Sequence, residues 1–272
     1  MSSDTRNYYI VKHHLEAFET LPNFVWRTEW PESYGLPRGF RMVEEGDRWI
    51  SYAYTTSYNQ ERPLSLVTGF YECVEEAWYG DVPRRARDLY VGSAWMIKGR
   101  TLGTPLSDPV VIKPISRFLR KPPFTQTTIS RISRREFEAI RSYTKRHQLA
   151  RQDIPGLGRD PRNEQEVLTV VAAGQKKLGI ERIVRAQTRF PDMLVKLKGK
   201  AEEVHLELEV RSTSFLFHGH KPRVRGHRFK EDKKPVAVLC WIDDDENGTV
   251  KPYVHRVFEL RDLLRKGTRI RW

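Results

Sequence analysis

The sequence predicts two domains of mixed class, an N-terminal half built mostly of β-strands and a C-terminal half of the α/β type. The chain has 272 residues, more than one ordinary domain needs and enough for two of about 100–150 residues each. Its pattern changes near the middle, where short alternating strands give way to a capped helix followed by apolar strands. Hydrophobic residues make up 39% of the chain, which allows each half a packed core.

The charge balance favours a polyanionic partner. Lys and Arg number 48 against 35 Asp and Glu, a formal net charge of +13, and such an excess is typical of proteins that bind nucleic acid or an anionic membrane surface. No apolar run approaches the roughly 20 residues that span a bilayer, and the first residues lack the apolar stretch of a signal peptide. Two cysteines are too few for a disulfide framework or a cysteine zinc site. We therefore expect a cytoplasmic protein with no membrane partner.

The N-terminal half, residues 1–149, has the pattern of a small barrel. Residues 48–55 alternate strictly, with Trp49 and Ser51 on one face and Ile50 and Tyr52 on the other, as in a half-buried strand. A turn of helix is expected at 14–20 and a helix at 133–147. The further expected strands are residues 8–11, 66–74, 94–98 and 110–115. Short strands with few helices predict a β-barrel.

A linker is expected at residues 150–160, because the segment from Arg151 to Arg162 carries two prolines, two glycines and scattered charge. The second domain, 161–272, then opens with a helix. Asn163 has the N-cap residue type, Glu166 lies at the capping-box position, and Gly179 is placed to end the helix. Strands are expected at 183–186, 193–196, 204–211 and 236–241, and a last helix at 259–266.

The strand at 204–211 carries the residues that indicate chemistry. Alternation places Leu206 and Leu208 on one face and Glu207 and Glu209 on the other. Two carboxylates on one face of an apolar strand are costly unless they bind a cation or pair with bases. Asp192 opens the preceding strand, so a hairpin can bring it beside Glu207. Three oxygen ligands suit Mg²⁺, with Mn²⁺ as the alternative; the simpler interpretation is the solvent face of an edge strand.

Pro191-Asp192, a hairpin and Glu207-Leu-Glu209 resemble the PD-(D/E)xK nuclease superfamily over roughly residues 160–245. The resemblance implies a restriction-endonuclease-like α/β fold in which Asp192 and Glu207 hold the metal and Glu164, on the first helix, completes its ligands. Glu209 stands where the family carries a lysine, and would position or deprotonate the attacking water. In the alternative register, Glu209-Val-Arg211, an arginine would take the lysine's place; it cannot act as a base but could stabilise phosphate charge.

Basic residues at the end of the strand and after it are expected to contact the DNA backbone, and a solvated loop is the alternative for those after it. The histidine pair among them could instead ligate metal or pack a loop. The expected contacts are Arg211, His218, His220, Lys221, Arg223, Arg225 and Arg228.

The order of motifs in residues 6–147 resembles the PUA-like superfamily, especially its EVE branch. The motifs include Tyr8-Tyr-Ile-Val11, Phe24-Val-Trp26 and Gly46-Asp47 before a strand. The resemblance implies a PUA-like β-barrel that recognises modified bases. A base pocket between Trp26, Trp49 and Trp95 is one interpretation of the aromatic residues, and an ordinary core is the other.

Together these features predict a Mg²⁺-dependent DNA endonuclease directed by a modified base, as in a modification-dependent restriction enzyme. Two alternatives stay open: a nucleic-acid-binding protein whose nuclease fold has lost its chemistry, which Glu209 in the lysine position supports, and an RNA-directed nuclease. Restriction-like nucleases often cut duplexes as dimers, so a homodimer is also open.

Overall fold

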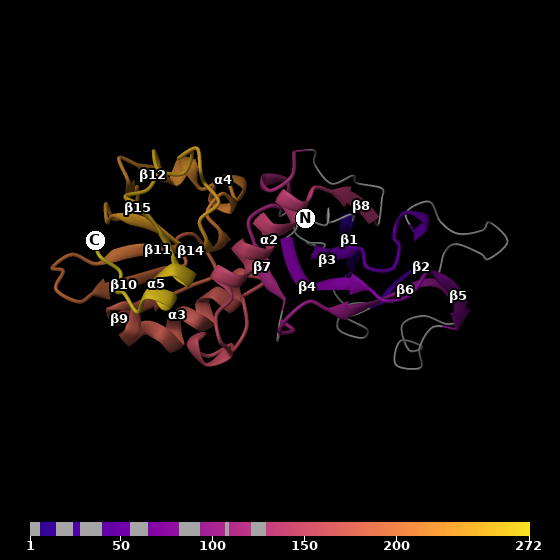
Figure 1. Ribbon diagram of the computed structural model, residues 1–272. Coiled ribbons are helices and arrows are strands. Elements are labelled where there is room, and N and C mark those ends of the chain that lie inside the picture. The colour runs from indigo at the N-terminus through magenta and orange to yellow at the C-terminus, as the bar shows by residue number, and fades with distance from the viewer. Residues whose placement is uncertain are drawn as a thin grey trace. The chain divides into compact units, whose positions relative to one another are not determined.

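A computed structural model describes residues 6–14, 24–27, 40–54, 65–81, 93–106, 109–120 and 129–272. The chain divides into two compact units with a boundary between His147 and Gln148. Helices and strands are mixed in the chain, as expected (Figure 1). Among the described residues, no helix combines the length and apolar character that a membrane crossing requires. The turn of helix expected at 14–20 lies outside the described residues, apart from His14 at the end of a strand.

The N-terminal unit is built on one sheet of eight strands, ordered β2-β6-β4-β3-β1-β8, with β5 paired to β6 and β7 to β4. The β1–β3 pair is parallel and the other pairs are antiparallel. Within the described residues the outer strands β2 and β8 do not pair, and the sheet curls as half of a barrel. Its strands are β1 (Tyr8–His14), β2 (Phe24–Arg27), β3 (Arg48–Tyr54), β4 (Ser65–Cys73), β5 (Trp78–Asp81), β6 (Ser93–Thr101), β7 (Val110–Ile112) and β8 (Ile129–Ile132).

Opposite faces of this sheet bury different apolar sets. Helix α2 (Arg134–His147) packs Phe137 and Ile140 against a set that includes Ile10 and Ile50. Trp49 belongs to the other set, with its ring centroid 5.6 Å from that of Tyr71. This division follows from the alternation of β3. Two short 3₁₀ helices, η2 (Phe40–Met42) and η4 (Ile115–Arg117), also belong to the described part of this unit.

The segment 150–160 is a packed part of the C-terminal unit, which corrects the expected linker. It includes the 3₁₀ helix η5 (Arg151–Asp153), and the side chain of Ile154 is buried. Pro155 lies so close to Gly174 of helix α3 that a Cβ at Gly174 would be 3.3 Å from the proline ring. Arg159 forms a two-point ion pair with Glu166 at 2.6 and 2.9 Å. These contacts hold the segment against α3.

Helix α3 (Glu164–Leu178) has the predicted caps. The Asn163 side chain accepts a hydrogen bond from the Glu166 backbone N–H at 2.9 Å. Gly179 ends the helix with φ +78°, a left-handed conformation in which glycine avoids the strain of a side chain. The N-terminus of α3 is thereby placed so that Glu164 stands in its first turn.

The C-terminal unit contains a mixed five-stranded sheet, ordered β15-β14-β11-β10-β9. Its strands are β9 (Ile180–Ala186), β10 (Met193–Leu197), β11 (Val204–Arg211), β14 (Val236–Ile242) and β15 (Arg256–Glu259). β11 is parallel to β14 and antiparallel to β10, and each of its eight residues is buried. The central strand is therefore covered on both faces, whereas edge strand β9 is largely exposed.

Helices cover this sheet differently on its two sides. Helix α3 contacts β9, β11 and the last helix, α5 (Leu260–Lys266). The short helix α4 (Ser214–Phe217), the 3₁₀ helix η6 (Lys221–Arg223) and the ribbon β12 (Val224–Arg225) and β13 (Arg228–Phe229) follow β11 in sequence. Figure 1 shows α4 and β12 across the sheet from α3. Phe215 and Phe229 there pack on Val236 and Val238 of β14.

Candidate metal centre

Asp192 and Glu207 meet across the β10–β11 hairpin. Met193 pairs with Leu206 in the antiparallel register, which sets Asp192 opposite Glu207. The Asp192 backbone N–H donates to Glu207 Oε2 at 3.2 Å, and the Leu208 N–H donates to Asp192 Oδ2 at 2.8 Å. The hairpin that the sequence predicted thus brings these two carboxylates side by side. The Phe190–Pro191 peptide bond just before them is cis.

Glu209 lies one alternation further along the same face of β11. Its side chain is 0% exposed, and its Oε1 is 3.1 Å from Nδ1 of His218. The same His218 nitrogen is 3.3 Å from Oε1 of Glu164, on the first turn of α3. Helix, strand and the segment after α4 therefore converge on one point.

His220 completes the cluster from the other side. Its Nε2 is 2.8 Å from Glu207 Oε1, and its ring stacks on Phe190 with centroids 4.3 Å apart and an interplanar angle of 18°. Between the histidines, Gly219 adopts φ +71°, which favours glycine. The turn brings both rings to the carboxylates, so the two histidines belong to the acidic cluster, and their contact with the DNA backbone stays a prediction.

Burial and repulsion between neighbouring carboxylates raise the pKa of Asp192, Glu207 and Glu209. Burial raises the pKa of Asp192 to about 7, and the nearby Glu207 charge adds to the effect. Burial raises the pKa of Glu207 to about 8, with a further contribution from Glu164. The pKa of Glu209 is well above its ordinary value because of burial and then the charges of Glu164 and Glu207. Burial and the adjacent His218 lower the pKa of His220 to about 4.

These residues fit a divalent cation. Glu209 Oε2 is buried and has no hydrogen-bond partner within the described residues, so an acceptor oxygen is held in the cluster without a donor. One ligand atom from each of Glu209, His218 and His220 lies within 4.8 Å of the others. Burial and mutual repulsion both disfavour the charged form of clustered carboxyls. A bound cation offsets these two effects by its positive charge and stabilises the carboxylates.

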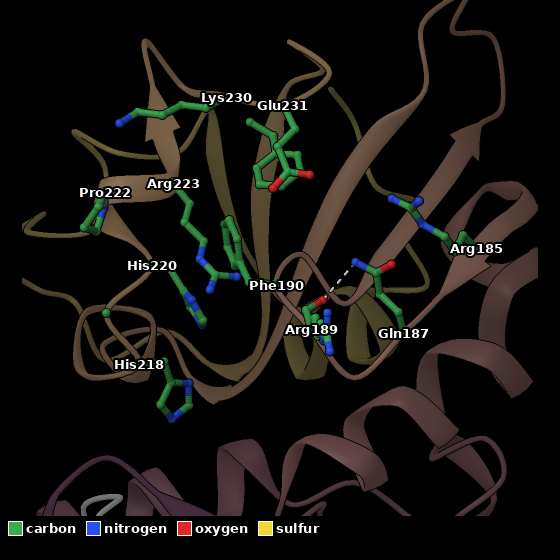
Figure 2. A pocket seen from close by; sticks show the side chains of 12 residues that line it. Arg185, Gln187, Arg189, Phe190, His218, His220, Pro222, Arg223, Lys230 and Glu231 are labelled. Carbon is green, nitrogen blue, oxygen red and sulfur yellow. Dashed lines mark hydrogen bonds between the residues drawn. The ribbon is translucent and has the colours of Figure 1, made fainter.

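A cavity of about 900 Å³ opens beside the two histidines (Figure 2). In Figure 2 the Arg223 guanidinium points toward the pocket centre beside His220 and Phe190, whereas the Lys230 ammonium points away. Arg185 and Arg189 contribute further cationic groups from the end of β9 and the loop after it. The pocket therefore combines positive charge with the aromatic rings of Phe190 and Phe229, next to the carboxylates.

The remaining expected backbone contacts have different surroundings. Arg211 is 4% exposed, which corrects its assignment to a DNA-contacting surface: the last β11 position is covered like the rest of the strand. Lys221 is exposed, with its Nζ 5.2 Å from the centroid of Tyr253. Arg225 is exposed on the β12–β13 ribbon. Arg228 is also exposed and pairs with Glu202 at 2.8 Å.

The expected base pocket is not assembled by the described tryptophans. Trp49 is 1% exposed and lies in the core, so it is not available to stack on an inserted base. Trp95, on β6, is half-buried and packs edge-on against Tyr79 at 5.5 Å. Trp26 lies on β2, and its side chain is outside the described part of the structure.

Sequence reasoning missed Arg185, Arg189 and Phe190 as pocket residues. Arg189-Phe190 directly precedes Pro191-Asp192, so position beside the candidate metal ligands was a signal that could have indicated the pair. Arg185 carried no such signal, because only the sheet order places β9 beside β10.

No protein-family model and no curated protein sequence matches the chain.

Proposed function

We propose that the C-terminal unit hydrolyses phosphodiester bonds in DNA with a divalent metal ion. We further propose that the N-terminal unit directs it to a modified base, as in a modification-dependent restriction enzyme. The observation that carries the first proposal is the convergence of Asp192, Glu207 and Glu209 with two histidines beside a basic pocket. Buried carboxylates at the edge of a cationic cavity are suited to hold a metal ion against a phosphate.

Each group has a role that its surroundings support. Asp192 and Glu207 would hold the ion, oriented by the Leu208 and Asp192 backbone N–H groups. The ion would activate a water molecule and polarise the phosphate. Glu209, facing His218 Nδ1 at 3.1 Å, would position or deprotonate that water once a bound cation stabilises its charged form. Arg223, with its guanidinium in the pocket (Figure 2), would neutralise phosphate charge.

A cleavage assay tests this proposal. Purified protein is incubated with a divalent metal and three duplexes, unmodified, 5-methylcytosine-containing and 5-hydroxymethylcytosine-containing, with a matched RNA alongside. Asp192→Asn keeps the shape of the side chain and removes its charge. Asp262→Asn is the matched control, because Asp262 lies on α5 and pairs with Arg265 and Lys266.

Cleavage of a modified duplex that is lost in Asp192→Asn and kept in Asp262→Asn is the expected result. Equal cleavage of all three duplexes would contradict recognition of a modified cytosine and would still support the proposed nuclease activity. Cleavage of RNA alone would redirect the proposal to an RNA nuclease.

A second candidate is a binding protein that retains the nuclease fold without activity. The observation that favours it is Glu209 in the position where the resembled family has lysine. Tight DNA retention without cleavage, with Mg²⁺ and with Mn²⁺, would establish this alternative.

A further inference from the structure

The two histidines give the cluster a ligand type different from its carboxylates. Nδ1 of His218 faces Glu209 Oε1 at 3.1 Å and Glu164 Oε1 at 3.3 Å. Nε2 of His220 faces Glu207 Oε1 at 2.8 Å. Each imidazole thus presents a ring nitrogen to the carboxylate oxygens that would surround a cation. The cluster therefore offers nitrogen and oxygen atoms together.

The placement of these rings is constrained by their neighbours. His220 stacks on Phe190 and lies 5.6 Å from the ring of Phe215, a fully buried residue of α4. His218 lies 5.6 Å from His220 across the Gly219 turn. Aromatic packing reduces the conformational entropy that a ligand side chain loses when it binds a metal. The rings are held toward the carboxylates before any ion is bound.

The ligand set decides which class of cation fits. Mg²⁺ prefers oxygen ligands and keeps much of its water, whereas imidazole nitrogen suits first-row transition metals. Affinities for sites that contain nitrogen rise from Mn²⁺ to Co²⁺ along the divalent series. We propose that this site selects a first-row transition-metal dication over Mg²⁺, with His218 and His220 supplying nitrogen ligands beside Glu209 and Glu207. This inference rests on the proposed metal-dependent function, since it concerns the same site.

The alternative role for the histidines is structural, in which they only hydrogen-bond to the carboxylates and leave an all-oxygen site. The two roles differ in one observable, the presence of nitrogen bonded to the metal. Selectivity alone does not separate the two roles, because the affinity order of the first-row metals holds at oxygen sites as well.

Metal binding to the full chain tests the inference without relying on activity. Calorimetric titrations use MgCl₂, MnCl₂ and CoCl₂ separately, and pulsed electron paramagnetic resonance of the Mn²⁺ complex detects directly coordinated ¹⁴N. The variants are His218→Gln and His220→Gln. His255→Gln is the matched control, because His255 is exposed and stacks on Trp272 away from the cluster. Circular dichroism verifies that each variant is folded.

We expect Co²⁺ and Mn²⁺ to bind on the order of tenfold or more tightly than Mg²⁺, with ¹⁴N coupling in the Mn²⁺ complex. His218→Gln and His220→Gln should each weaken the ¹⁴N coupling and reduce the affinity ratio of Co²⁺ and Mn²⁺ to Mg²⁺. His255→Gln should change neither the coupling nor this ratio. Equal affinities, absence of ¹⁴N coupling or absence of metal binding in the wild-type chain would overturn the inference. If a variant fails to fold, the spectrum of the wild-type Mn²⁺ complex still shows whether nitrogen is bonded to the metal.

The cleavage assay separates this inference from the proposed function. Cleavage supported by Mg²⁺, with no nitrogen bonded to the metal, would support the proposed nuclease activity and contradict the proposed preference for a transition-metal ion. Nitrogen-ligated metal without cleavage of any nucleic acid would keep the selectivity and overturn the nuclease.

Discussion

Glu207→Gln is expected to remove a pH-dependent loss of stability from the metal-free C-terminal unit. The Glu207 side chain is 4% exposed and lies 2.8 Å from His220. Burial raises the pKa of Glu207 from 4.5 to about 8, and burial lowers the pKa of His220 from 6.5 to about 4. Glutamine keeps an acceptor for the Asp192 N–H and a polar partner for His220, but it cannot ionise.

The sign and size follow from counting protons on this pair. Between pH 4.5 and 6.5 the unfolded chain carries one proton on His220 and the folded chain one on Glu207, so the two effects cancel. Above pH 6.5 the unfolded pair holds none, whereas the folded pair keeps one until about pH 8. The state with more bound protons loses stability as pH rises, by about 1.4 kcal/mol per pH unit. The loss up to pH 8 is therefore about 2 kcal/mol.

Hydrogen exchange of the β11 and β14 amides measures this change within the C-terminal unit. The exchange is measured in EDTA and corrected for intrinsic exchange rates. Between pH 6.5 and 8 the protection factors of these amides should fall about 30-fold more in the wild-type protein than in Glu207→Gln. The Glu207 charge also helps to raise the pKa of Asp192 to about 7, so the glutamine variant should lose less stability from Asp192 as well, which adds to the difference. An equal fall in the two proteins would refute the assignment of the proton to this pair.

Three further predictions concern other parts of the chain. Trp49→Ala should destabilise the N-terminal unit by about 3–5 kcal/mol in calorimetric unfolding, because the ring is buried against Tyr71; an unchanged transition with altered base preference would instead support a pocket. Asn163→Ala should lower the free energy of unfolding of the C-terminal unit by about 1 kcal/mol, because the hydrogen bond from the Glu166 N–H is lost. A thermal unfolding transition of that unit unchanged by the substitution would contradict this expectation. Arg223→Gln should weaken DNA binding and reduce the slope of log affinity against log salt by about one; a salt titration with an unaltered slope would remove Arg223 from the phosphate contacts.

Sequence patterns located helices α3 and α5 and strands β9, β10, β11 and β14 because their signals are local, whereas β15, α4 and the β12–β13 ribbon were not predicted. The Asn163 cap and the Gly179 end of α3 depend on hydrogen bonds within a few residues. Strand β11 has the predicted bounds, Val204–Arg211, because its alternation is uninterrupted. The opposition of Asp192 and Glu207 followed from the length of one hairpin.

The exposure of particular side chains could not be predicted in the same way. Arg211 shares the alternation of Glu207 and Glu209, which left open whether that face met solvent. The segment 150–160 has a linker composition, yet Ile154 and Pro155 pack against α3. In both cases burial depends on which segment packs over the residue. The sequence of that segment does not indicate which part of the chain it will cover.

By itself the sequence determined the basic charge, the positions of most strands and helices, and the presence of two carboxylates on one face of β11. Those properties depend on composition, alternation and capping, which act over a few residues. Only the tertiary structure decided that His218 and His220 turn to the carboxylates, that Arg185 and Arg189 line the adjoining pocket, and that Trp49 is core. These depend on which elements pack over which faces, because burial is fixed by contacts between segments far apart in the chain.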